Sequence, residues 1–262
     1  MKSRAWCWVG ASSVGTSHIE AKKECDDSAA CIELQAEGGP LLVAVVFDGA
    51  GSADFGGIGS RLVVRGFVRS AYKYLNQGGA IRAISDEMAR EWIDAVRDRI
   101  FVAAKEKSAL PRDFAATLVG LVVGPQRAVV CHIGDGACVL REQVTMDWTV
   151  PSWPAHGEYA SSTNFVTDDP EAQLRVIHLE GSYRDIAVFS DGIERMVLDF
   201  KNNTAFARFF DVMLAPLKGN QPGRDRLLSR RLRDYLASKA VNDRTDDDKT
   251  LMMAHKIEAP SS

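Results

Sequence analysis

A run of aliphatic residues that ends on an acid constrains this chain more than any other feature. Residues 41–47, LLVAVVF, are continuously apolar, which is typical of a strand buried on both faces. Asp48 follows directly, and glycine then recurs at positions 49, 51, 56 and 57. A simple Asp-Gly turn does not need four glycines. The pattern predicts a strand end that presents a carboxylate, followed by a loop that lets a ligand approach the backbone.

Other apolar patterns predict the remaining elements. Helical spacing predicts a helix over 58–75 and another that begins at Ser85 or Asp86, both good N-cap residues. Two further helices are expected over 206–214 and 227–236. Strands are expected within 4–15, 28–37, 114–124, 127–133, 137–142, 174–181, 185–192 and 250–257. Short glycine-containing connections predict antiparallel hairpins, which pair 114–124 with 127–133, 127–133 with 137–142, and 174–181 with 185–192.

The order of these elements indicates an α+β fold. The helices occur in pairs and do not follow every strand, which argues against a doubly wound parallel sheet. An antiparallel core with helix pairs on its outer faces fits better. Since no domain boundary is evident, residues 1–262 are expected to form a single domain.

Composition and charge exclude several classes of protein. Lys and Arg number 32 against 35 Asp and Glu, a net charge of −3, and no basic patch is apparent, so nucleic acid is not an expected partner. No apolar run is long enough to span a membrane, and the N-terminus is too weakly apolar for a signal peptide. The five cysteines include no CxxC pair, which indicates reduced thiols. We therefore expect a cytoplasmic protein without a membrane partner.

Acidic residues recur where the expected strands begin or end. They are Asp26 and Asp27, Asp48, Asp135, Asp191, and the triplet Asp246, Asp247 and Asp248. An acid at a strand end is also a common turn residue, and for Asp135 a hairpin turn explains the residue equally well. If the strand ends meet at one edge of the core, however, the carboxylates repel one another. Mg²⁺ or Mn²⁺ would relieve that repulsion, because both ions prefer oxygen ligands.

The same segments resemble, in order, the motifs of metal-dependent protein phosphatases of the 2C type, in the bacterial branch. They are SHIEAKKECDDSA, VVFDGAGSADFGG, DFAATLVGLVV with Thr117, CHIGDGACVL, IAVFSDGIERM and DDDKTLMMA. Any one of these matches is weak, but six in order over nearly the whole chain are specific. The resemblance implies a four-layer α-β-β-α sandwich, in which antiparallel helix pairs flank two antiparallel sheets.

The resemblance also implies a function. Members of the family hydrolyse phosphoserine and phosphothreonine with a metal-activated water and without a phosphoenzyme. The implied cofactors are two Mn²⁺ or Mg²⁺ ions and a weak third, and the implied partners are phosphorylated proteins, such as a Ser/Thr kinase and its targets. We expect a monomer. The segment 147–169 is expected to cover the active site as a flap, where Trp148, Trp153 and Tyr159 either contact a partner or pack locally.

Matching positions imply the roles of individual residues. Asp48 is expected to bridge both metals, and Asp27 to orient a metal-bound water. The Gly49 carbonyl is a further implied ligand. Asp191 and Asp247 are implied to hold one ion, Asp26 to touch the other, often through water, and Asp135 to be linked to the third.

Three positions depart from the family pattern. Ala50 stands where eukaryotic members have a histidine that is suggested as the general acid, and His18 is a candidate replacement by proximity to the opening motif. Lys22 stands where other members have an arginine that binds phosphate. Lys22 could bind phosphate as a point charge, without the two parallel hydrogen bonds of an arginine, or it could form a solvated charge pair with the next lysine. Arg195 stands where an acid of the third metal site is usual, with Glu194 before it.

Rival functions fit the same residues less well. Neither register of the glycine loop gives GxGxxG, because Asp54 or Leu62 occupies the third glycine position, and no GxxxxGK[ST] exists. A haloacid-dehalogenase-type phosphatase would need an acid at Ala50. A catalytically weak or inactive scaffold protein with the same fold is the stronger alternative, although Asp48, Asp191 and Asp247 are all retained.

Overall fold

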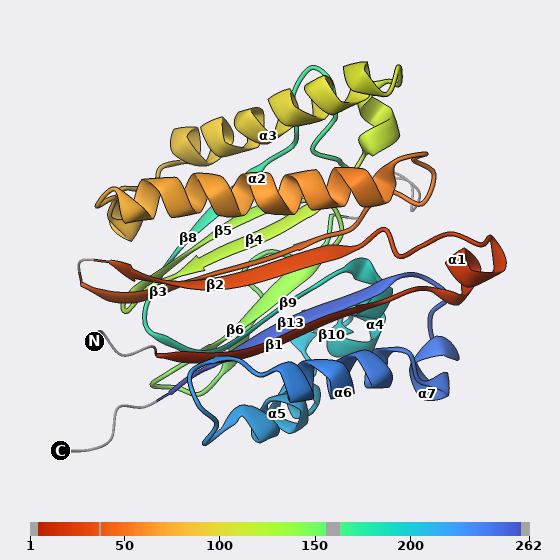
Figure 1. The fold of residues 1–262 in the computed structure, drawn as a ribbon. Helices are drawn as coiled ribbons and strands as arrows, with labels where there is room; N and C mark the ends of the chain where they lie inside the picture. The colour runs from red at the N-terminus through yellow and green to blue at the C-terminus, as the bar shows by residue number, and fades with distance from the viewer. Residues whose placement is uncertain (1–4, 37, 156–162, 258–262) are drawn as a thin grey trace.

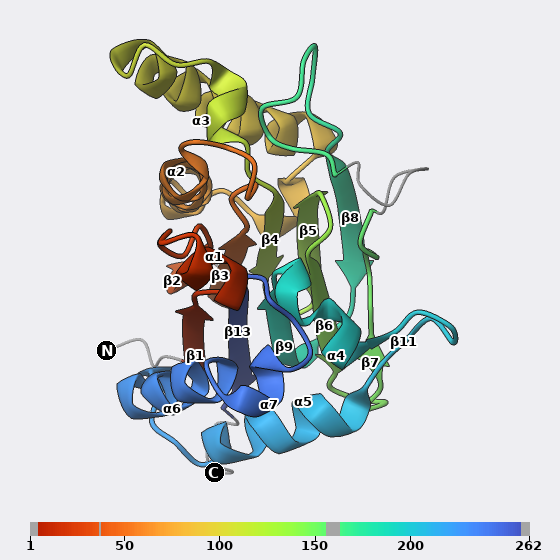
Figure 2. The ribbon, with the colours of Figure 1, turned by 90° about the vertical axis from the view of Figure 1, so that its right-hand side faces the viewer.

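Two β-sheets lie face to face at the centre of the molecule, and helices cover their outer faces (Figures 1 and 2). This computed structural model describes residues 5–36, 38–155 and 163–257. The five-stranded sheet has the order β2 (Ser28–Ala36), β3 (Gly39–Phe47), β4 (Leu118–Val123), β5 (Arg127–Ile133) and β8 (Arg175–Glu180). The six-stranded sheet has the order β12 (Gly223–Arg224), β1 (Trp6–Ser13), β13 (Lys249–Lys256), β9 (Tyr183–Phe189), β6 (Ala137–Glu142) and β7 (Trp148–Thr149).

Nearly all strand pairs in these sheets are antiparallel; β1 and β12 form the parallel exception among the described strands. A separate small ribbon joins β10 (Leu198–Asp199) and β11 (Thr204–Ala205). The four-layer α+β architecture implied by the sequence is therefore confirmed.

Two pairs of helices form the outer layers. α2 (Gly56–Asn76) and α3 (Asp86–Glu106) cover the five-stranded sheet, and α5 (Ala207–Leu214) and α6 (Arg226–Leu236) cover the other (Figure 2). Short helices α1 (Thr16–Glu20), α4 (Glu194–Val197) and α7 (Lys239–Asn242) lie in the connections. Ser85 begins α3 as expected, since its hydroxyl accepts a hydrogen bond from the Met88 N–H at 3.2 Å. No helix in the described part of the chain is long and apolar enough to cross a membrane.

β3 explains why residues 41–47 are continuously apolar. Val43, Val45 and Phe47 pack toward α2 and α3, whereas Leu42 and Val46 pack between the two sheets. Both faces of the strand are therefore buried, although its pairings are antiparallel. The same packing leaves the strand end at Asp48 fixed relative to both sheets.

Two of the predicted hairpins are wrong. The pairing of 114–124 with 127–133 is confirmed as β4–β5, but the strand begins only at Leu118. β5 and β6 lie in different sheets, and so do β8 and β9. The Gly-Asp-Gly connection at Asp135 carries the chain from β5 in one sheet to β6 in the other, and each strand buries its apolar side chains in its own sheet. The hairpin explanation for Asp135 therefore fails.

Phe67 on α2 gives a test of this packing. It is fully buried, meets Trp92 edge-on with 5.8 Å between ring centroids, and lies against Gly120 of β4. We expect Phe67→Ala to lower the free energy of unfolding by about 3–5 kcal/mol, because it leaves a cavity between the helices and the sheet. Tyr72→Ala, at a position 47% exposed on the same helix, should change it by less than about 0.5 kcal/mol. Urea denaturation of both variants measures the difference, and equal effects would contradict this packing.

Candidate metal centre

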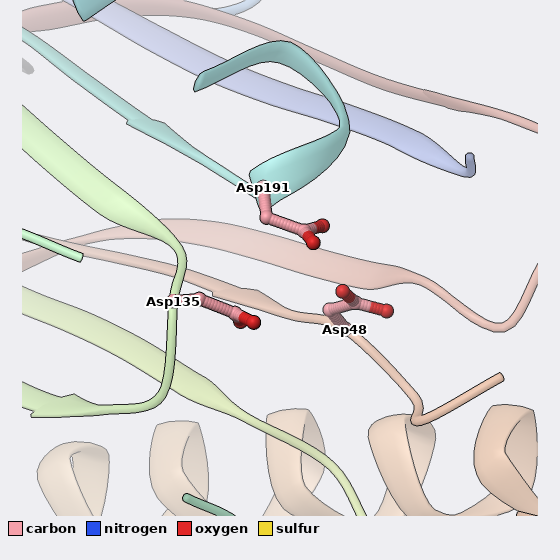
Figure 3. Close-up of side chains that lie close together, drawn as sticks. All are labelled: Asp48, Asp135 and Asp191. Atoms are coloured by element: carbon pink, nitrogen blue, oxygen red, sulfur yellow. The ribbon is translucent and has the colours of Figure 1, made fainter. Parts of the chain in front are cut away.

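Acids from distant parts of the chain meet at one edge of the sandwich. Asp48 follows β3, Asp135 lies between β5 and β6, and Asp191 follows β9. One carboxylate oxygen from each of the three lies within 4.8 Å of the others, and Figure 3 shows the side chains directed into a common space. The prediction that these strand ends converge is therefore confirmed for these three aspartates.

The backbone at Asp48 is held on both sides by Thr117. The Asp48 N–H donates to the Thr117 hydroxyl at 3.2 Å, and the Thr117 N–H donates to the Asp48 carbonyl at 2.8 Å. Gly49 lies so close to α2 that an added Cβ would be 2.5 Å from the Gly56 carbonyl carbon. Only glycine fits there, which explains part of the glycine-rich loop.

Asp26 and Asp27 reach the same edge from the start of β2 but face different neighbours. Asp26 lies against the N-terminus of α2, where a Cβ on Gly57 would be 2.5 Å from its carboxylate. Burial raises the pKa of Asp26, and the Gly57 backbone N–H partly lowers it. Asp27 is buried and accepts a hydrogen bond from the Ser190 hydroxyl at 2.8 Å. The loop glycines thus make room for Asp26, while Asp27 faces the cluster.

The carboxylates of the cluster are poorly compensated by the protein. Loss of hydration raises the pKa of Asp27 and of Asp191 to about 7 each. It also holds the pKa of Asp48 well above its ordinary value, and the charges of Asp27 and Asp191 add to this effect. One oxygen each of Asp27, Asp135 and Asp191 has no hydrogen-bond partner among the described residues. Buried oxygens without donors, close to one another, fit a hard divalent cation.

The acidic triplet before β13 divides into two roles. Asp247 is half-buried, loss of hydration raises its pKa, and its charge acts on Asp48. Asp248 is buried and accepts hydrogen bonds from the Gly15 and Asp26 N–H groups, each at 2.6 Å. Sequence reasoning missed this structural role of Asp248. The available signal was its place directly before a strand whose first residues are all buried.

His18 is positioned by Asp248. Its Nδ1 lies 3.0 Å from the Asp248 carboxylate and 3.2 Å from the Glu24 carbonyl. Because both partners are acceptors, Nδ1 carries the hydrogen. A Cβ on Gly51 would lie 3.6 Å from Nε2, so Nε2 faces the loop that follows Asp48. The structure therefore places His18 beside the loop that follows Asp48, with Nε2 facing Gly51.

The two lysines of the opening motif differ in their contacts. Lys22 is exposed, has φ of 57°, and contacts none of the predicted ligands among the described residues. Lys23 donates from Nζ to the Gly51 carbonyl at 3.0 Å. Lys23, which sequence reasoning set aside, is thus the lysine that reaches the loop.

Glu194 supplies a carboxylate near the position where Arg195 replaces the usual acid. Its side chain is buried, and loss of hydration and the charges of Asp191 and Asp135 raise its pKa to about 8. The Arg195 side chain is 89% exposed, with Nε 4.0 Å from the Glu194 carboxylate. A carboxylate therefore remains beside Asp135 and Asp191, one residue before the position at which the family pattern expects it.

The segment 147–169 is attached beside the cluster at both of its described ends. The Ala155 N–H donates to the Gly134 carbonyl at 3.0 Å, and the Thr163 hydroxyl donates to Asp135 at 2.5 Å. Trp148 packs on Phe210 and Trp153 packs on Phe200. The structure thus supports local packing for both tryptophans. Tyr159 lies outside the described residues.

Solved structures with this fold include bacterial serine/threonine phosphatases. Phosphatase Stp1 from Staphylococcus aureus superposes with a TM-score of 0.64 at 14% identity, covering 96% of this chain and 95% of that one. The catalytic domain of phosphatase PstP, in complex with two manganese ions, gives a TM-score of 0.61 at 14% identity, covering 98% and 100%. At these identities the likeness establishes the fold.

Sequence comparison establishes the family. The model described as Protein phosphatase 2C matches residues 14–237. Serine/threonine-protein phosphatase 3 of Escherichia coli (strain K12) is 37% identical over 255 residues, which cover 95% of this chain and 98% of that protein. The chain belongs to the protein phosphatase 2C family.

Neighbouring aspartates of the triplet give a test of the site's construction. We expect Asp248→Asn to lower the free energy of unfolding by about 1–3 kcal/mol, because an amide cannot accept both buried N–H groups. Asp247→Asn should change it by less than about 0.5 kcal/mol in the absence of metal, since the amide still accepts from the adjacent N–H. Denaturant unfolding in EDTA measures both, and the reverse order would contradict the assignment.

The raised pKa values predict how stability depends on pH without metal. The folded protein keeps protons on Asp27 and Asp191 up to about pH 7, whereas the unfolded chain releases them near pH 4. The contribution of these groups to the free energy of unfolding therefore falls as the pH rises through that window. Asp191→Asn removes one of them, so in EDTA the variant should gain stability over wild type as the pH rises. Thermal unfolding between pH 4.5 and 7.5 measures this difference, and a difference independent of pH would contradict it.

Proposed function

We propose that this protein is a serine/threonine protein phosphatase that depends on Mn²⁺ or Mg²⁺. The observation that carries the proposal is the group of facing carboxylates at Asp48, Asp135 and Asp191. Asp135 and Asp191 each have a buried oxygen without a hydrogen-bond partner among the described residues, which fits a divalent cation. The E. coli relative bears the name of a serine/threonine phosphatase, and the PstP structure holds two manganese ions. Both support the same activity and cofactor here.

Metal binding is assigned to the acids of this edge. Asp48, Asp191 and Asp247 would hold one ion, and Asp48 with Asp26 the other, with the Gly49 carbonyl as a further ligand. Asp135 and Glu194 would contribute to a weak third site. Divalent cations in this position supply positive charge for the phosphate oxygens and lower the pKa of water. Thr117 and the close contact of Gly49 with α2 keep the Asp48 carboxylate in place for this purpose.

The remaining residues of the edge are assigned to proton and phosphate handling. Asp27, fixed by the Ser190 hydroxyl, orients the attacking water through its second oxygen. His18, fixed by Asp248 through Nδ1–H, can give a proton from Nε2 to the departing Ser or Thr oxygen when both ring nitrogens are protonated, in place of the histidine that Ala50 replaces. Lys22 and Lys23 are the basic residues of the opening motif that could bind the substrate phosphate. The hydrogen bond from Lys23 to the Gly51 carbonyl favours Lys23 for this role.

Phosphorylated proteins are the proposed substrates, with a Ser/Thr kinase and its targets as partners. The proposal includes a single domain, a monomeric state and a cytoplasmic location. The segment 147–169 would act as a flap that meets the partner, because its described ends bond to the Asp135 connection. An inactive scaffold is the alternative, against which the retained and poorly compensated acids argue.

Hydrolysis of an aryl phosphate with Mn²⁺ tests the activity. We expect Asp48→Asn to lower kcat/KM by at least about 100-fold, because it removes the carboxylate shared between the ions. Asp54→Asn is the matched control, since Asp54 is an exposed acid of the same glycine loop, and it should keep wild-type activity. Absence of turnover with every divalent ion, on phosphopeptides as well, would favour the scaffold.

A further inference from the structure

A groove lined by arginines runs along the outer edge of the six-stranded sheet, between β1 and α6. The two elements lie side by side in both views (Figures 1 and 2), and the groove has a volume of about 360 Å³. Its polar lining comes from Ser12, Arg224, Arg226, Ser229, Arg230 and Arg233. None of these residues belongs to the proposed metal centre, so the groove is a separate feature of the surface.

The charge of this groove is not neutralised by the protein. Arg226, Arg230 and Arg233 are exposed, and none of them forms an ion pair or hydrogen bond within the described part of the chain. Asp225, which precedes Arg226, is occupied by the Leu228 N–H at 2.8 Å and by Asn220 at 3.0 Å. Asp234, which follows Arg233, is exposed and forms no ion pair with these arginines among the described residues. Like charges four residues apart on a helix repel each other, so this row opposes helix stability. An anionic partner would remove that repulsion.

The floor of the groove is an edge of β1 that β12 covers only in part. β13 pairs with β1 along its whole length, but β12 pairs only with Cys7 and Trp8. Beyond them both outward backbone groups of Gly10 are occupied, because its N–H donates to the Ser229 hydroxyl and its carbonyl accepts from Arg224, each at 3.3 Å. Outward-facing backbone groups alternate along a strand, so Ser12 comes next, and no described strand pairs with it on that side. At Ser12 the edge can still bond to an added extended chain, whereas Gly10 is already occupied.

The spacing of the arginines suits a row of acids on an extended chain. On α6 the rise is about 6 Å from Arg226 to Arg230 and about 4.5 Å from Arg230 to Arg233. Alternate side chains on an extended chain are about 6.6 Å apart. A chain with an acid at every second position therefore matches the row better than one compact phosphate group does.

We propose that this groove binds an extended acidic segment of the protein substrate, at a distance from the phosphate that is hydrolysed. The proposal rests on the phosphatase function proposed above. β1 leads from the groove to Gly15, whose N–H bonds to Asp248 at the acidic edge. A segment that follows β1 therefore runs toward the metal centre, and the arginines select substrates with acidic residues near the phosphorylated site.

Direct binding tests the groove independently of catalysis. The probes are a fluorescent peptide with glutamate at alternate positions and the same peptide with glutamine, both without phosphate. Fluorescence anisotropy should show binding of the glutamate peptide, weakened about tenfold or more by the combined substitution of Arg226, Arg230 and Arg233 with glutamine. Arg231→Gln is the matched control, because Arg231 lies on the same helix but lines a different, apolar pocket.

Kinetics test the link to the substrate. On a phosphopeptide with acidic flanks the triple variant should show a KM about tenfold higher with kcat unchanged, whereas kcat/KM on an aryl phosphate should equal that of wild type. Equal binding of the two peptides, full affinity in the triple variant, an equal loss in Arg231→Gln, or tighter binding of a single-stranded oligonucleotide would overturn the proposal. Lack of turnover with peptide binding intact would instead reject the proposed function on which it rests.

Discussion

Mutual repulsion of carboxylates at one end of the sandwich is the constraint on which the rest of this structure depends. Asp48, Asp135 and Asp191 approach within 4.8 Å although they come from three separate connections. Loss of hydration and neighbouring charges raise the pKa of Asp48, Asp191 and Asp27. A protein gains nothing in stability from such a cluster without a cation. The apolar layers around β3 and the clamp of Thr117 on Asp48 hold the acids together despite this cost.

The surroundings of the cluster are built from residues that hold ligands in place. Asp248 ties Gly15, His18 and the Asp26 backbone to the start of β13. Ser190 joins Asp27 to β13, because its hydroxyl donates to Asp27 and accepts from the Thr250 N–H at 3.0 Å. These contacts link the opening motif, the end of β9 and the start of β13 into one unit. Preorganisation of this kind lets a metal site bind without large rearrangement.

Much of the fold and part of the site could be predicted from the sequence. The continuous apolar run of β3, the cap at Ser85 and the acids at strand ends could be predicted, because each depends on a local pattern. The sheet to which each strand belongs could not be predicted, since the connection at Asp135 has the same local sequence whether it closes a hairpin or crosses between sheets. Side-chain direction was also hidden, so that Asp248 and Lys23 were missed. The arginine row on α6 was overlooked because a net charge of −3 conceals a local positive patch.

The central claim is that divalent cations bind between these acids, and anomalous diffraction at the manganese edge tests it most directly. Crystals grown with Mn²⁺ should show two strong anomalous peaks in contact with the Asp48 carboxylate, one of them also in contact with Asp191. The contradicting result would be an Asp48 carboxylate without any adjacent peak at saturating Mn²⁺, with the strand ends arranged as described here.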